Sequence, residues 1–240
     1  MSKKTEKFVL GIIPARGASK RIRGKALALL GGKKLLSYAI EEAKKSKLLS
    51  EVIVSTESSE IALEAKKLGA LVPFKRPKEL ALDETPMLPV LKQAVIESEK
   101  FFSKKVDAVV LLQLTSPFRK ARHIDEAVRI FLKGGIEGVV SVSRAKTEPK
   151  WMLKKKSGVL EFYEKNDFSA SRKQDMKEFF ELNGAVYVFS RETVMNSKGY
   201  AWGKRIAAYE MDKISSIDID EPIDLEIANA LLRAGLNEND

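Results

Sequence analysis

Short apolar runs alternate along the chain with longer stretches in which the apolar positions recur at helical spacing. The runs suited to buried strands are residues 8–13, 52–55, 71–74, 108–114 and 138–142. The stretches with helical spacing are residues 35–47, 58–68, 86–102 and 124–132. Strands that alternate with helices in this order predict an α/β fold, in which a mostly parallel sheet is flanked by helices.

The pattern changes after Ser143. Residues 144–182 hold a basic run around Lys155 and few long apolar runs, which indicates an inserted arm or flap, the alternative being a plain pair of surface loops. A strand-like pattern resumes at Gly184 with AVYVFS, and a last helix is predicted over residues 223–234. We therefore expect residues 1–240 to form a single domain with an insertion at about residues 144–182.

Composition indicates a globular chain outside the membrane. Hydrophobic residues make up 44% and charged residues 32%, and no apolar run approaches the roughly 20 residues that a membrane-spanning helix needs. The polar start, MSKKTEKF, predicts no secretory signal peptide. Cysteine is absent, which excludes disulfides, thiolate metal sites and cysteine nucleophiles. A cytoplasmic protein without a membrane partner is expected.

A formal net charge of +10 raises the question of a nucleic-acid partner. Many of the cations, however, lie in mixed segments such as residues 41–45 and 64–67, which are typical of solvated helix faces. We therefore expect a small anionic ligand and no nucleic acid.

Residues 12–25, reading IIPARGASKRIRGK, carry the strongest indication of such a ligand, because an apolar strand passes directly into a cationic loop. The cations are Arg16, Lys20, Arg21, Arg23 and Lys25. Gly17 and Gly24 permit backbone geometries in which N–H groups turn toward an anion. Ligands bind at the carboxyl ends of strands in open α/β sheets, so a phosphate site is predicted, with a basic surface turn as the alternative. A Walker loop is excluded, since Ser19 and Ala26 stand where it needs glycine and a hydroxyl residue, and no GxGxxG is present near the strand.

A second group of functional candidates is the acidic stretch SIDIDE near the carboxyl terminus. If residues 216–220 are extended, Asp218 and Asp220 share one face while Ile217 and Ile219 face the core. Two carboxylates on one face suit Mg²⁺, which takes its other ligands from phosphates and water. The alternative is that Asp220 caps the last helix.

A third candidate is the polar end of the strand in LLQLTSPFR. Gln113, Thr115 and Ser116 both donate and accept hydrogen bonds, as sugar recognition requires, although ordinary turn chemistry would explain the same residues. His123, the only histidine, lies at the start of a predicted helix and is expected to be a surface residue without a catalytic role.

Taken in order, the motifs resemble those of the acylneuraminate cytidylyltransferase family. The matching stretches are IPARGASKRIRGK, residues 76–81, LLQLTSPFR, RKQ followed by ELNGAVYVF, and DIDEPIDLEIA. The resemblance extends from residue 12 to about residue 230. It implies a Rossmann-like nucleotidyltransferase sheet with a small dimerisation arm, in a homodimer.

The resemblance also implies a reaction, in which CTP and a nonulosonic acid of the sialic, legionaminic or pseudaminic type give a CMP-sugar and pyrophosphate. The anomeric hydroxyl would attack the α-phosphate in line, with Mg²⁺ as the cofactor. Two alternatives stay open. The sugar acid could be the eight-carbon acid of lipopolysaccharide, or the chain could bind nucleotide without turnover, because Ala18 and Ala26 replace a glycine and an asparagine of the family.

The residue roles that the resemblance implies fall into four groups. Nucleotide binding is expected of Arg16, Gly17, Ser19, Lys20, Arg21, Lys25 and Arg76. Sugar binding is expected of Gln113, Thr115, Ser116, Arg172 and Gln174. Metal binding is expected of Asp218 and Asp220, and the catalytic set is expected to be Lys25, Arg16, Asp218 and Asp220.

Overall fold

A computed structural model describes residues 7–164, 178–199 and 203–236 of the chain. Its centre is a six-stranded sheet in the order β10-β6-β9-β5-β1-β4. The strands are β1 (Val9–Pro14), β4 (Glu51–Ser55), β5 (Ala108–Leu111), β6 (Gly138–Arg144), β9 (Phe180–Ser190) and β10 (Ile206–Glu210). Within this sheet only β9 runs against its neighbours, β5 and β6. The predicted fold class, a mostly parallel sheet flanked by helices, is confirmed.

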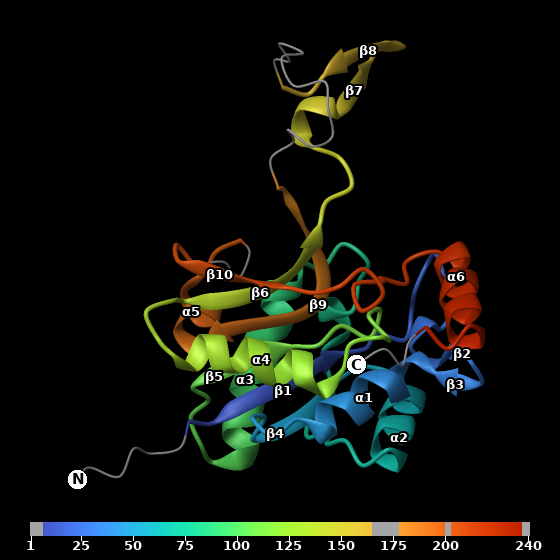
Figure 1. Cartoon of the computed structure of the whole chain (residues 1–240). Coiled ribbons are helices and arrows are strands. Elements are labelled where there is room, and N and C mark those ends of the chain that lie inside the picture. Colours follow the sequence, from blue (N-terminus) through green and yellow to red (C-terminus); the bar gives the residue numbers. More distant parts are fainter. Residues whose placement is uncertain (1–6, 165–177, 200–202, 237–240) are drawn as a thin grey trace.

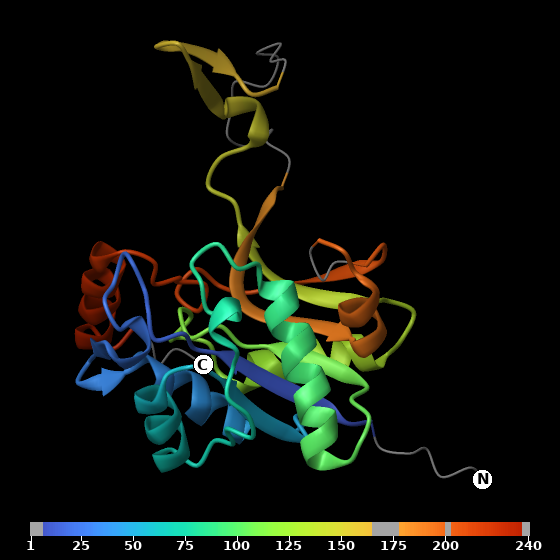
Figure 2. The ribbon, with the colours of Figure 1, turned by 180° about the vertical axis from the view of Figure 1, so that it is seen from behind.

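Helices cover both faces of the sheet (Figures 1 and 2). One face carries α1 (Leu35–Lys45), α2 (Ser59–Lys67) and α4 (Ala121–Leu132), and the other carries α3 (Met87–Phe102) and α5 (Arg191–Asn196). Side chains of β1 alternate between the two cores, with Val9 and Ile13 on the first face and Leu10 and Ile12 on the second. Because both faces of β1 are buried, its sequence reads as a continuous apolar run.

The remaining elements lie at the edges. The last helix, α6 (Pro222–Arg233), packs against the two-residue strand β2 (Leu29–Leu30), which pairs with β3 (Lys33–Lys34). Short 3₁₀ helices are formed by Lys25–Leu27, Lys78–Leu80 and Pro149–Trp151. Within the described residues, no helix is both long enough and apolar enough to cross a bilayer.

Residues 144–182, predicted to form an arm, contain a hairpin that stands away from the body (Figure 1). Strands β6 and β9 continue to pair beyond the rest of the sheet, as far as Arg144 opposite Phe180. They lead into β7 (Leu153–Lys156) and β8 (Val159–Phe162), which pair with each other in antiparallel register.

Two predicted strand segments differ from the structure. Residues 71–74 form no strand, because Pro73 has no N–H to donate and only Leu71 bridges to Ile53. The strand predicted over residues 108–114 ends at Leu111, and residues 112–116 continue as the loop that carries the polar residues. Residues 217–220, considered above as an extended stretch, belong to no strand, and the Ile219 N–H donates to the carbonyl of Thr115.

Candidate functional site

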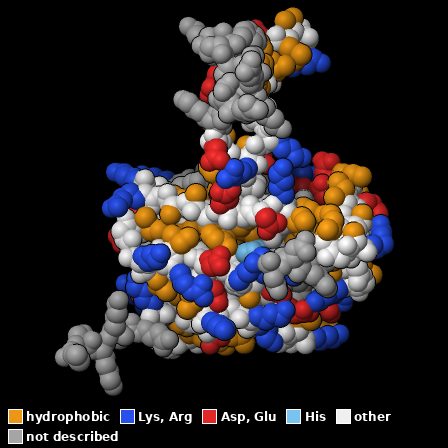
Figure 3. Space-filling view, viewed as in Figure 1, with side chains coloured by type: hydrophobic (Ala, Val, Ile, Leu, Met, Phe, Trp, Pro, Cys, Tyr) orange, Lys and Arg blue, Asp and Glu red, His pale blue; other side chains and the backbone are white. Residues whose placement is uncertain are grey.

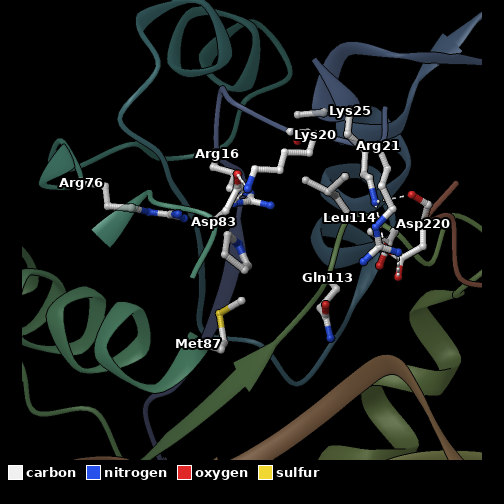
Figure 4. A pocket seen from close by; sticks show the side chains of 14 residues that line it. Arg16, Lys20, Arg21, Lys25, Arg76, Asp83, Met87, Gln113, Leu114 and Asp220 are labelled. Carbon is white, nitrogen blue, oxygen red and sulfur yellow. Dashed lines mark hydrogen bonds and ion pairs between the residues drawn. The ribbon is translucent and has the colours of Figure 1, made fainter. Parts of the chain in front are cut away.

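A cleft of about 360 Å³ lies at the carboxyl ends of β1 and β5 (Figure 4). Its walls come from four segments that are distant in sequence, namely the end of β1 with the loop after it, residues 76–87, the loop after β5, and Asp220 shortly before α6. The residues that line it are Pro14, Arg16, Ser19, Lys20, Arg21, Lys25, Ala26, Arg76, Asp83, Met87, Gln113, Leu114, Thr115 and Asp220. Parallel strands bring these loops together because their carboxyl ends meet at one edge.

Most of the sequence-predicted site residues meet in this cleft. The predicted residues found there are Arg16, Ser19, Lys20, Arg21, Lys25, Arg76, Gln113, Thr115 and Asp220. Gly17, Ser116 and Asp218 are not part of its lining. Arg172 and Gln174 lie outside the described residues.

Lys25 and Asp220, 195 positions apart, form the closest link between the first loop and the acidic stretch. The Lys25 ammonium lies 2.9 Å from Asp220 Oδ1 and donates to the Ile219 carbonyl at 2.8 Å, with only 14% of its side chain exposed. Arg21 reaches the other oxygen, Oδ2, at 3.1 Å. The hydrogen bond from Lys25, followed by the charges of Lys25 and Arg21, lowers the pKa of Asp220.

The cap of α6 is formed by other residues than Asp220. Glu221 is the N-cap residue, and Asp224 Oδ2 accepts from the Asp220 and Glu221 N–H groups at 2.9 and 2.7 Å. The carboxylate of Asp220 is therefore directed at the cations of the cleft, and Asp224 holds its backbone in place.

Asp218 lies in a different electrostatic environment from Asp220. Its carboxylate accepts a hydrogen bond from the Thr115 hydroxyl, and part of its surface reaches solvent. Its pKa is nevertheless raised, first by the loss of hydration among the surrounding protein atoms and then by the negative charges of Asp220 and Asp224. A positively charged ligand beside Asp218 would relieve this repulsion.

The carboxylate pair fits Mg²⁺ but would leave much of its coordination shell open. Across the described part of the chain, no group of three or more acidic, histidine or cysteine residues is placed to hold a metal ion. Mg²⁺ commonly takes one or two carboxylates and completes its octahedron with phosphates and water. Asp218 and Asp220, next to a cationic cleft, match that pattern.

Asp83 is a site residue that the sequence reasoning missed. Its two carboxylate oxygens contact Arg16 Nη1 at 2.5 Å and Lys20 Nζ at 2.9 Å. The hydrogen bond from Lys20 contributes most to lowering the pKa of Asp83. The segment LALDETP contains no phosphate or metal motif, so only the fold reveals that Asp83 meets the first loop.

Two predicted nucleotide ligands take part in the scaffold of the cleft. Arg76 is buried and donates from Nε to Ser55 Oγ at 3.1 Å and from its other nitrogen to the Ser55 carbonyl, and burial lowers its pKa to about 10. The Gly17 N–H donates to Glu57 Oε1 at 2.6 Å. A Cβ at Gly17 would come within 3.0 Å of Ser58 Cβ, so glycine permits the close approach of the two loops.

A buried arginine holds the loop after β5. Arg119 Nη1 donates to the carbonyls of Gln113 and Ala185 at 2.8 and 2.9 Å, and burial lowers the Arg119 pKa to about 10. This contact ties the loop to β9 and keeps Gln113 at the cleft. Ser116 is buried instead of facing the cleft, and its hydroxyl has no hydrogen-bond partner among the described residues.

The prediction that His123 is a surface residue is wrong. Its side chain is 4% exposed, and Nδ1 accepts from the Lys120 N–H at 3.1 Å across the first turn of α4. Burial is the main cause that lowers the His123 pKa to about 4. His123 therefore serves as a neutral cap within the fold.

A second pocket, of about 540 Å³, adjoins the cleft. Met87 and Gln113 line both cavities. The other lining residues of the second pocket are Pro86, Leu88, Leu91, Leu111, Leu182, Tyr187, Phe189 and Gly199. A polar, cationic cleft thus continues into a largely apolar pocket, with Gln113 at the junction.

Comparison with known proteins supports a nucleotidyltransferase. The family model described as "Cytidylyltransferase" matches residues 10–239. The chain is 34% identical to a CMP-N,N'-diacetyllegionaminic acid synthase of Legionella pneumophila, over 93% of this chain and 96% of that protein. It is also 34% identical to an N-acylneuraminate cytidylyltransferase of Escherichia coli, over 92% of this chain but only 51% of that protein.

A similar solved structure shows the same fold. It is a CMP:2-keto-3-deoxy-manno-octonic acid synthetase complexed with CTP, with a TM-score of 0.70, 16% sequence identity, and coverage of 95% of this chain and 100% of that chain. At 16% identity, this similarity supports a shared fold and nothing further.

Proposed function

Since the chain belongs to the cytidylyltransferase family, we propose that it transfers CMP from CTP to a nonulosonic acid of the sialic, legionaminic or pseudaminic type. One observation carries the proposal most directly. Lys25 and Asp220 meet at the edge of a cleft that also presents Arg16, Lys20 and Arg21, in a chain 34% identical to a legionaminic acid CMP-synthase.

The cations of the first loop are suited to the triphosphate of CTP. Arg16, Lys20, Arg21 and Lys25 supply charge-assisted hydrogen bonds, and Ser19 adds a hydroxyl at the same wall. Arg76 shapes the cleft through its contact with Ser55 at the end of β4, and Gly17 does so through Glu57 in the segment after β4. Such a site stabilises the charge that develops during transfer because its donors are already in place.

In the proposed reaction, the anomeric hydroxyl oxygen of the sugar acid forms a bond to the α-phosphorus of CTP. The bond from that phosphorus to the oxygen bridging to the β-phosphate breaks, the hydroxyl proton is released, and pyrophosphate leaves. Lys25 is the proposed catalytic cation at the reacting phosphorus, since its ammonium is largely buried and directed by the Ile219 carbonyl. Positioning and charge neutralisation would supply most of the acceleration.

Mg²⁺ is proposed as the cofactor, with Asp218 and Asp220 as its protein ligands. When bound, it would neutralise phosphate charge and stabilise the departing pyrophosphate. The raised pKa of Asp218 and the like charges beside it support a cation at this place. Asp220, whose pKa is lowered by Lys25 and Arg21, stays ionised to take part.

The second pocket is the proposed binding site of the sugar acid. Its apolar walls suit N-acyl groups, while Gln113 at the junction and Thr115 in the cleft would bind hydroxyl groups. Arg172 and Gln174 stay proposed sugar contacts on the strength of the family resemblance, whereas Ser116 is buried and lines neither cavity. A homodimer whose arms help complete the sugar sites, and a cytoplasmic location with access to CTP, belong to the same proposal.

Pyrophosphate release tests the proposal. Purified protein with Mg²⁺ and CTP would be assayed with a panel of nine-carbon nonulosonic acids and with the eight-carbon acid, and each reaction would be repeated with ATP, GTP or UTP. Release that requires CTP and a nine-carbon acid is expected. Release with the eight-carbon acid alone would support the first alternative, and CTP binding without turnover on any acid would support a nucleotide-binding protein.

A further inference from the structure

The four cations of the first loop that line the cleft are paired with two carboxylates of different origin. Arg21 and Lys25 meet Asp220, which belongs to the proposed metal site. Arg16 and Lys20 meet Asp83, which lies between the 3₁₀ helix Lys78–Leu80 and α3. Figure 4 shows the Asp83 side chain lying against Arg16 and Lys20 in the cleft.

The contacts of Asp83 resemble those that a phosphate group would make. One oxygen lies 2.5 Å from Arg16 and the other 2.9 Å from Lys20, so each oxygen takes one cation. Two acidic oxygens held by an arginine and a lysine are also what a bound phosphate offers. These cations cannot give the same hydrogen bonds to Asp83 and to a triphosphate at once.

The loop around Asp83 holds the carboxylate beside the two cations and also allows the Asp83 side chain to rotate away from them. The Thr85 hydroxyl donates to the Glu79 carbonyl at 3.0 Å, and the Thr85 N–H donates to the Leu82 carbonyl at 3.2 Å, which closes a turn around residue 83. The side chain of Asp83 is 28% exposed and can therefore rotate into solvent. Solvent-exposed ion pairs are weak enough for a strongly charged ligand to displace.

We propose that Asp83 is an internal anion that competes with the triphosphate of CTP for Arg16 and Lys20. In the empty site it neutralises two cations that would otherwise repel each other and the nearby Arg76, whose pKa the charge of Arg16 helps to lower. On binding, the triphosphate displaces Asp83, and the carboxylate recaptures the cations as pyrophosphate leaves. Asp83 thus raises the KM for CTP and favours product release. The inference rests on the proposed function.

Asp83→Asn tests the competition, because it removes the charge and keeps the shape of the side chain. Calorimetry with inorganic pyrophosphate and with CTP should show about three- to tenfold tighter binding than in the unmodified chain, the range expected for loss of exposed ion pairs. In turnover, the KM for CTP should fall without a rise in kcat, and pyrophosphate should inhibit at lower concentration. A residue that only stabilised the loop would not produce this combination.

Glu84→Gln is the matched control, since Glu84 is the next residue, is exposed and does not line the cleft. It removes the same charge from the same loop, so its binding constants should stay within twofold of the original. Asp83→Ser should repeat the effect of the asparagine variant, and thermal unfolding would verify that both variants fold. Equal or weaker pyrophosphate and CTP binding in the Asp83 variants would overturn the inference. If the unmodified chain itself failed to bind CTP, the proposed function would fall instead.

Discussion

Asp218 and Asp220, which are separated by one residue, have pKa shifts in opposite directions, and this difference indicates different roles. Asp220 is held ionised by Lys25 and Arg21, which lower its pKa. Asp218 has a raised pKa because its surroundings withdraw hydration and because Asp220 and Asp224 repel its charge. In the proposed metal site, a cation would therefore stabilise Asp218 most, and Asp220 would link that site to Lys25.

We expect Asp218→Asn and Asp220→Asn each to reduce kcat by about 100-fold or more, because neutral amides bind Mg²⁺ poorly and the leaving pyrophosphate loses stabilisation. The Mg²⁺ concentration needed for half-maximal rate should rise as well. Steady-state assays across a Mg²⁺ series would measure both effects. Glu226→Gln, which neutralises an exposed carboxylate of α6, is the control. Near-normal turnover in both aspartate variants would refute a metal role for the pair.

His123 is a buried group through which pH acts on the fold. The charged and titratable groups around it are Arg119, Arg122, Glu126, Tyr209 and Asp212. Burial and the charge of Arg122 hold its pKa at about 4, whereas Asp212 and Glu126 act in the opposite direction. The unfolded chain, with a histidine pKa near about 6.5, therefore binds a proton before the folded protein does, so stability falls as the pH drops from about 6.5 toward 4.

Acidification from about pH 7 to pH 5 should cost about 2 kcal/mol of unfolding free energy through His123 alone. Urea unfolding at the two pH values measures this loss. In His123→Gln, an amide oxygen can still accept the Lys120 N–H, but nothing titrates, so the loss over this interval should be about 2 kcal/mol smaller than in the original chain. Equal losses in the two proteins would show that His123 does not bind its proton on unfolding.

Contacts between residues that are distant in sequence could be predicted only where the residues lie in recognisable motifs. Lys25 and the two aspartates stand in recognisable motifs, and their meeting follows once the strands are placed in a parallel sheet. Asp83 lies in no such motif, because only the path of its loop in the fold brings it to Arg16 and Lys20. His123 was misplaced because ArgHisIleAsp gives no sign that Tyr209 of the edge strand β10 packs over it.

At the scale of elements, continuous apolar runs predicted strands well when both faces of the strand are buried. β1, β5 and β6 are of this kind, and each was located within a few residues. β10 was missed because Ile206–Glu210 is an edge strand in which no residue is fully buried. β2 and β3 hold two residues each, too few for any periodicity to show.

The predicted start of β9 differs from the start in the structure. The apolar pattern AVYVFS begins after Gly184, but the strand begins at Phe180. A bulge separates the two parts, where the register against β6 shifts between Val140 and Val142 and Gly184 has a φ of 71°. Glycine tolerates this conformation, and the irregularity redirects the strand from the body toward the arm.

At the scale of the whole molecule, the sheet is what assembles the cleft. Four loops meet at one edge because β1 and β5 are parallel neighbours and the residues before α6 hydrogen-bond to the loop after β5. The order of the motifs therefore predicted most of the cleft lining before the fold was known. The second pocket could not be predicted in this way, since its apolar lining residues look like ordinary core in the sequence.

The arm exposes apolar side chains that a single chain leaves uncovered. Its β7–β8 pairing places Leu153 opposite Phe162 and Lys155 opposite Leu160, so Leu153, Leu160 and Phe162 share one face. Leu153 is 50% and Leu160 61% exposed, and Figure 3 shows hydrophobic side chains at the end of the projecting arm. A two-stranded hairpin is marginal by itself, and exposed apolar clusters mark interaction surfaces.

We therefore expect the 26.8 kDa chain to be a dimer, of about 54 kDa by light scattering, joined through the arms. Leu160→Glu should shift the mass toward the monomer, because the glutamate would bury a charge without a partner in the interface. It should also weaken sugar-acid use more than CTP binding, since the CTP cleft is built within one chain. Leu63→Glu, at a leucine of α2 that is 57% exposed, is the matched control and should leave the mass unchanged. A monomeric original chain at micromolar concentration, or a fully dimeric Leu160→Glu variant, would rule out dimerisation through this face of the arm.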